Sequence, residues 1–96
     1  MITSFGDKAT SDLFHGVSSR YIRALPNQIH EIAIQKLDVL NAVQNLDDLR
    51  SPPGNRLESL KGDLKGYHSI RINSQWRIVF RWETNSASYV QIMDYH

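Results

Sequence analysis

The chain has 96 residues, of which 41% are hydrophobic and 22% are charged, and its formal net charge is +1. This length supplies one hydrophobic core, so we predict a single domain over residues 1–96. The sequence contains no cysteine, which excludes disulfides, thiolate catalysis and zinc–thiolate or iron–sulfur sites. Its apolar runs are short and its first residues lack the features of a signal peptide. We therefore expect a cytoplasmic protein without membrane contact.

The first half of the chain is predicted to form a short strand and two helices. Within residues 1–5, Ile2 and Ser4 alternate and Phe5 follows, which favours a short strand ending at Gly6. Asp7 can cap a helix that ends at Gly16, because glycine readily adopts left-handed backbone. A longer amphipathic helix is expected after Pro26, with a further turn over residues 46–50. Its apolar face is predicted to contain Ile29, Ile32, Ala33, Leu37, Leu40 and Val43.

The second half of the chain changes to the period of β-strands after the Ser-Pro-Pro-Gly-Asn segment. Strands are expected at residues 57–60, 67–73, 75–83 and 88–95, separated by turn-forming residues. A run of strands after a helical pair indicates an α+β fold. We predict an antiparallel sheet with two amino-terminal helices packed on one face, in the order β-α-α-β-β-β-β.

Positive charge is concentrated in the predicted sheet. Residues 1–55 hold five basic and six acidic side chains, whereas residues 56–81 hold six basic and two acidic ones. The second segment therefore carries about +4, which indicates a surface for an anionic ligand. The alternative is that these charges are simply solvated, as they are on many small sheets.

The alternation of apolar residues predicts how two of the strands pair. The large apolar side chains of residues 75–83 fall on one face, and Arg77 falls on the other. A hairpin with a three-residue loop at 73–75 then places Arg71 directly opposite Arg77. Like charges in this position destabilise a sheet, and an anion such as phosphate would relieve the conflict.

Two simpler explanations for the arginine pair remain open. Both side chains can extend into water, or they can pair with Asp94 or Glu83. The carboxyl-terminal strand reaches the same sheet face and ends in Tyr95 and His96. Histidine titrates near neutral pH and can transfer protons, although a terminal histidine is more often exposed and idle.

Other motifs add little to this hypothesis. The remaining histidines show no metal-ligand spacing, so we predict no metal site. There is no phosphate-binding glycine loop, serine-hydrolase elbow or dinucleotide fingerprint, and we expect no cofactor. Tyr67 and Tyr95 could stack on bases, but a core position is the commoner role of a single aromatic residue.

Three segments carry a resemblance to a known family. They are residues 51–63 (SPPGNRLESLKGD), residues 66–80 (GYHSIRINSQWRIVF) and the closing DYH of residues 94–96. With the opening MITSF, these segments resemble the HigB toxins of bacterial type II toxin-antitoxin modules, within the RelE superfamily. The resemblance extends over nearly the whole chain.

The resemblance implies a ribosome-dependent mRNA endonuclease that enters the ribosomal A site and cuts translated message. In this family the ribose 2′-hydroxyl attacks the adjacent phosphate, which requires neither a metal ion nor a small-molecule cofactor. The implied partner is a HigA-type helix-turn-helix antitoxin. The toxin would contact operator DNA only through this antitoxin. A compact toxin can take its substrate positioning from the ribosome.

The resemblance also assigns roles to individual residues. It gives phosphate stabilisation to Arg77 and Lys61, and proton transfer to His96, with Tyr95 and Asp94 shaping its position. The residues expected to contact RNA or the ribosome are Lys65, Arg71, Asn73 and Gln75, of which Arg71 follows from the strand register.

The chain departs from one branch of the family at Glu58 and Ser59, where that branch has His-Pro. Glu58 replaces a candidate proton shuttle, and a carboxylate is a poor acid at neutral pH. His96 then works with less help, cleavage is slower, or Glu58 acts as the base.

A different class of function also fits the basic face. A module that binds ribosomal or transfer RNA would stall translation without cutting mRNA, and cleavage products separate the two functions. We expect both Arg77→Ala and deletion of His96 to abolish toxicity and to leave folding intact, because both residues lie off the apolar side of the sheet.

Overall fold

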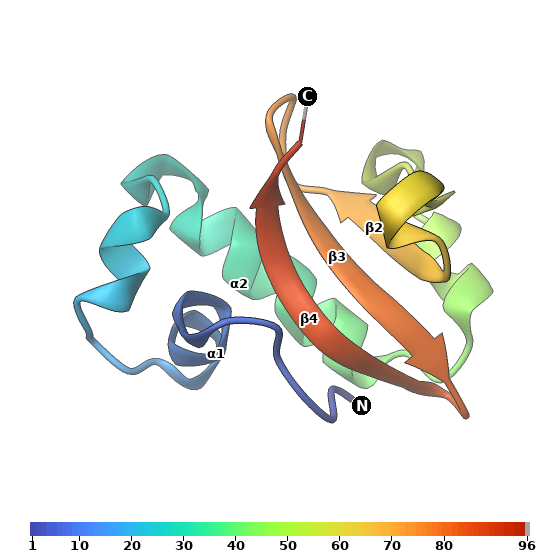
Figure 1. The fold of residues 1–96 in the computed structure, drawn as a ribbon, viewed down its shortest axis with the longest axis horizontal. Helices are drawn as coiled ribbons and strands as arrows, with labels where there is room; N and C mark the ends of the chain where they lie inside the picture. Colours follow the sequence, from blue (N-terminus) through green and yellow to red (C-terminus); the bar gives the residue numbers. More distant parts are fainter. Residues whose placement is uncertain (96) are drawn as a thin grey trace.

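A computed structural model of the chain describes residues 1–95 (Figure 1). An antiparallel sheet forms one layer, helix α2 crosses behind it, and α1 lies beside strand β4. The predicted α+β class, with helices on one face of the sheet, is confirmed. In chain order the elements are α1 (Lys8–His15), η1 (Tyr21–Ala24), α2 (Asn27–Ala42), η2 (Leu46–Arg50), η3 (Pro53–Asn55), β1 (Glu58–Ser59), η4 (Gly62–Leu64), β2 (Tyr67–Arg71), β3 (Trp76–Glu83) and β4 (Ser86–Asp94).

The amino-terminal segment corrects the predicted order. The sheet has the order β1-β2-β3-β4, and residues 1–5 contribute only isolated parallel bridges from Ile2 and Phe5 to β4. Backbone hydrogen bonds form at both bridges, but between them Tyr89 has a φ of 51° and donates its N–H to Ser4 Oγ, which interrupts the ladder. The predicted first strand is therefore wrong, and the observed order is α-α-β-β-β-β.

The helices form where the sequence predicts them. Asp7 caps α1 by accepting from Thr10 N–H, and Gly16 ends this helix with a φ of 71°. The α2 face is buried at Ile29, Ala33, Leu37 and Leu40, as expected. Ile32 is an exception, since 42% of it is exposed. None of the helices within residues 1–95 is long and apolar enough to cross a membrane.

The strand register confirms the predicted pairing of the two arginines. Strands β2 and β3 pair with Arg71 opposite Arg77, while Ile70 lies opposite Ile78 on the core side. β2 ends two residues earlier than predicted because Ile72 N–H and Asn73 N–H both donate to Trp76 O in the turn. The core between α2 and the sheet includes the fully buried residues Leu37, Leu40, Ile70, Ile78, Phe80 and Val90.

A buried hydroxyl joins α1 to the sheet. Thr10 is fully buried, and its Oγ1 accepts the backbone N–H of Ile92 at 3.0 Å. Because Ile92 lies in β4, this hydrogen bond fixes the helix against the strand that leads toward Tyr95.

We expect Thr10→Val to lower the free energy of unfolding by about 1–3 kcal/mol, since it leaves the buried Ile92 N–H without an acceptor. Thr10→Ser is the matched control because it keeps the hydroxyl. Urea denaturation of the two variants measures the difference. Equal midpoints for Thr10→Val and wild type would contradict this role.

Asp12 gives the fold a dependence on pH. This buried carboxylate accepts from Lys8 Nζ at 2.8 Å and from Ser19 Oγ at 2.7 Å. The hydrogen bond from Lys8, joined by that from Ser19, holds the pKa of Asp12 below its ordinary value of 3.8. Its stabilisation is therefore complete above pH 3.8 and is lost as the pH falls through the lowered pKa.

We expect Asp12→Asn to be less stable than wild type at pH 7, with the two unfolding free energies converging as the pH falls below 3.8. Denaturant titrations at a series of pH values measure this. A difference that stays constant with pH would show that the charge of Asp12 does not stabilise the fold.

Candidate functional site

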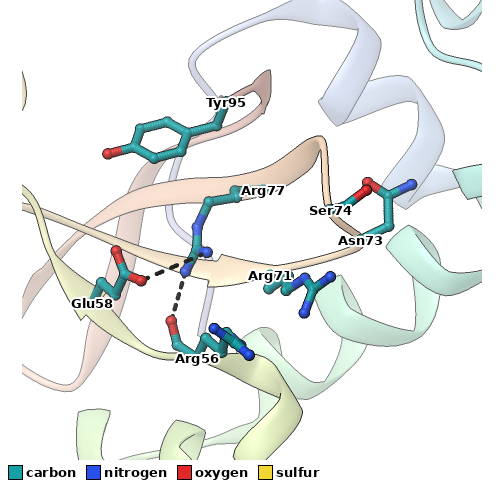
Figure 2. Close-up of a pocket in the computed structure, with 7 residues that line it drawn as sticks. All are labelled: Arg56, Glu58, Arg71, Asn73, Ser74, Arg77 and Tyr95. Carbon is teal, nitrogen blue, oxygen red and sulfur yellow. Dashed lines mark hydrogen bonds and ion pairs between the residues drawn. The ribbon is translucent and has the colours of Figure 1, made fainter.

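A polar pocket of about 320 Å³ opens at the end of the sheet where the β2–β3 turn meets the carboxyl-terminal end of β4 (Figure 2). The predicted pair Arg71 and Arg77 both line it, as does Tyr95. The predicted strand register thus brings the two arginines into one pocket. The full lining consists of Arg56, Glu58, Arg71, Asn73, Ser74, Arg77 and Tyr95.

Arg77 is the fixed centre of this pocket, with only 7% of the residue exposed. Its Nε donates to Ser69 Oγ at 2.8 Å, and its Nη2 donates to the backbone carbonyl of Arg56 at 2.6 Å. Glu58 Oε1 lies 3.9 Å from Nη1. A buried guanidinium with partners on three sides is held in one orientation.

These contacts bear on the simpler explanations for the arginine pair. Arg77 is buried beside Glu58 and does not extend into water, and Glu83, one of the alternative partners, lies 3.6 Å from Arg81 instead. In Figure 2 the guanidinium of Arg71 extends apart from that of Arg77, which reduces their repulsion. The pocket is therefore lined by three arginines, Arg56, Arg71 and Arg77, and by one partly exposed carboxylate, that of Glu58.

The burial of Arg77 also changes the expected effect of its removal. Arg77→Ala would leave the buried Ser69 hydroxyl and the Arg56 carbonyl without their donor, at a cost of about 1–3 kcal/mol. The expectation of an unaffected fold is therefore replaced by one of reduced stability.

Tyr95 and the β2–β3 turn form the remaining walls. The Tyr95 ring centroid lies 5.8 Å from the guanidinium carbon of Arg77, and 40% of Tyr95 is exposed. Asn73 Oδ1 accepts the N–H groups of Gln75 and Trp76, so this side chain shapes the turn. Gln75 donates to Asp94 at 3.1 Å and accepts from Tyr95 N–H, which ties the end of β4 to the turn.

The remaining predicted site residues differ in their position relative to the Arg77 pocket. Lys61 and Lys65 flank η4, are exposed and do not line the Arg77 pocket. Glu58 does line it, as the ion-pair partner of Arg77. His96, predicted to transfer protons, lies outside the described residues.

Two residues that hold Arg77 were not in the predicted site. Ser69 is fully buried on β2, and Arg56 adopts a φ of 46° that directs its carbonyl to the guanidinium. Strand alternation alone puts Ser69 on the face of Arg71, which was the available signal. No pattern of side chains predicts the Arg56 contact, because the contact is made by the backbone.

We expect Ser69→Ala to lower the free energy of unfolding by about 1–3 kcal/mol, because Arg77 Nε then lacks its acceptor in a buried position. Ser59→Ala, at an exposed position of the neighbouring strand β1, should change stability by less than about 0.5 kcal/mol. Urea denaturation of both variants is the measurement. A Ser69→Ala variant as stable as the Ser59→Ala variant would refute the anchoring of Arg77.

The solved structures most useful for comparison are small bacterial toxins. The YoeB dimer from Staphylococcus aureus has a TM-score of 0.61 at 22% identity and covers 99% of this chain and 97% of its own. YoeB in the YoeB–YefM complex from the same organism has a TM-score of 0.60 at 18% identity, covering 100% and 98%. The fold is therefore that of the YoeB toxins.

Sequence comparison defines the family within this fold. Residues 3–96 match the family described as the RelE-like toxin of type II toxin-antitoxin system HigB. Toxin HigB-1 from Vibrio cholerae is 42% identical over 82 residues, 85% of this chain and 84% of that protein. Endoribonuclease HigB from Proteus vulgaris is 32% identical over the full length of both chains. The chain belongs to the HigB family of RelE-like type II toxins, as the sequence motifs predicted.

Proposed function

We propose that this toxin is a ribosome-dependent endoribonuclease that enters the ribosomal A site and cuts mRNA there. The observation that carries the proposal is the buried guanidinium of Arg77, held through Nε and Nη2 in a concave pocket that also holds Arg71 and Tyr95. Such a group can stabilise charge on a phosphate without reorganising during the reaction. The name of the Proteus vulgaris relative, Endoribonuclease HigB, supports RNA cleavage.

The proposed reaction uses the RNA as its own nucleophile. The ribose 2′-oxygen loses its proton and bonds to the adjacent phosphorus, the bond to the 5′-oxygen breaks, and that oxygen takes up a proton. The products are a 2′,3′-cyclic phosphate and a free 5′-hydroxyl, and no metal ion takes part. The chain has to supply a base, an acid and cations for the charge that grows on the phosphate.

The residues of the pocket take these roles in the proposal. Arg77 stabilises the phosphate, Arg71 adds a second cation, and His96 transfers a proton, with Tyr95 and Asp94 positioning the reacting groups. Glu58 partly neutralises Arg77 in the free toxin, and a bound phosphate would compete with it for the guanidinium. Asn73 and Gln75 contact RNA from the turn, while Lys61 and Lys65 contact RNA or ribosome beside η4.

The proposed partners follow from the family and the reaction. A HigA-type helix-turn-helix antitoxin neutralises the toxin and connects it to operator DNA, and the toxin meets ribosomes and mRNA in the cytoplasm. YoeB of Staphylococcus aureus is known in complex with YefM, which supports an antitoxin partner for a toxin of this fold.

We expect 5′-end mapping of a defined mRNA on programmed ribosomes to show cuts that require the ribosome and survive chelation. Deleting His96 should abolish the cuts, and Arg71→Ala should slow them by about 100-fold, as for the loss of one charge-stabilising donor. Arg50→Ala is the matched control, since Arg50 is an exposed arginine that pairs with Asp47 away from the pocket. Stalled ribosomes carrying intact mRNA would instead identify a binding module.

A further inference from the structure

A second pocket, of about 250 Å³, lies on the same sheet face as Arg77. Val79, Gln91 and Met93 form its floor, and the aromatic rings of Tyr67 on β2 and Tyr89 on β4 belong to its walls. In Figure 1 the amino-terminal segment lies along β4 and η4 lies over β2, on either side of this face. α2 covers the opposite face, so the pocket opens away from the core.

This pocket adjoins the candidate active site. Met93 is the strand partner of Arg77, and Val79 follows Arg77 by two residues on β3. Two residues span about 7 Å along a strand. An extended RNA strand whose phosphate meets Arg77 would therefore place a neighbouring base over Val79 and Gln91.

The backbone at Tyr89 is strained in a way that exposes the ring. Tyr89 has a φ of 51°, unusual for an aromatic residue, and lies on β4 where the register with β3 shifts between Val79 and Arg81. The residue is 56% exposed, and its N–H donates to Ser4 Oγ. A strained backbone that turns a large aromatic ring toward solvent contributes nothing to the core, and such strain is characteristic of binding sites.

The other walls suit a flat heteroaromatic ligand. The guanidinium carbon of Arg81 lies 5.6 Å from the centroid of the Tyr67 ring and holds it at the pocket edge. The side-chain amide of Gln91 lines the pocket beside Gly6 and offers a hydrogen-bond donor and an acceptor on one group. The site therefore combines aromatic faces, an apolar floor and one amide, as in pockets that bind nucleobases.

We propose that this pocket binds the base of a nucleotide next to the scissile phosphate, with Tyr89 stacking on the base and Gln91 contacting its edge. The proposal rests on the proposed RNA cleavage and adds a base-recognition site to it. Stacking on Tyr89 would fix the position of the strand, and the Gln91 amide would make cleavage depend on which base is bound.

The test is single-turnover cleavage on programmed ribosomes, with a series of mRNAs that each lack one base near the cut. Wild type should cut one member of this series about 5- to 150-fold more slowly than the intact mRNA, the range expected for losing one stacked base. Tyr89→Asn should slow cleavage of the intact mRNA by a similar factor and should cause no further loss on that abasic mRNA. Asparagine tolerates left-handed backbone, so this variant preserves the conformation of β4 at residue 89.

Two controls separate stacking from other effects. Tyr89→Phe keeps the ring and should therefore keep the loss on the abasic mRNA, whereas Tyr21→Asn, which alters an exposed tyrosine in η1, should cut at the wild-type rate. Wild-type cleavage that is insensitive to every missing base would overturn the proposal without any variant. The proposal would also be overturned if the losses of cleavage rate caused by Tyr89→Asn and by the missing base were fully additive. Neither result would contradict the proposed RNA cleavage. Absence of cutting by wild type on intact mRNA would overturn both proposals.

Discussion

The structure depends on one buried cation, the guanidinium of Arg77. A charge in this position is unfavourable unless it has polar partners; Ser69 and the Arg56 carbonyl accept hydrogen bonds from Arg77, and the carboxylate of Glu58 lies 3.9 Å away. These partners come from β2 and from the segment that enters β1. The sheet edge and the loop after η3 are therefore positioned by the same group that defines the pocket.

The packing of the helices makes that arrangement rigid. α2 buries its apolar face against Ile70, Ile78 and Phe80. Because side chains alternate along a strand, the adjacent residues Ser69 and Arg77 lie on the opposite face of the sheet. The hydroxyl of Thr10 then fixes β4 through the N–H of Ile92, three residues before Tyr95. Core packing on one side of the sheet consequently sets the geometry of the polar side, without any loop having to close over it.

The polar face of the sheet carries two pockets that adjoin each other along the strand direction. Arg71, Arg77 and Tyr95 occupy one end, and Tyr67 and Tyr89 occupy the adjoining pocket. A cationic site followed by aromatic rings is the combination that binds single-stranded nucleic acid, because phosphates and base faces are recognised separately. The family relationship and this arrangement therefore support the same class of substrate.

The sequence by itself determined the two helices, the α+β class, the Arg71–Arg77 pairing and the family, because these follow from periodicity, capping residues and local motifs. It did not determine that residues 1–5 only bridge to β4, since the left-handed backbone of Tyr89 directs its N–H to the Ser4 side chain between the two bridges. Only the tertiary structure decided that Glu58 neutralises Arg77, that Lys61 lies outside the pocket, and that Arg56 contributes a carbonyl. The exposure of Tyr89 was also decided there, because a register shift and a positive φ leave no signal in residue type.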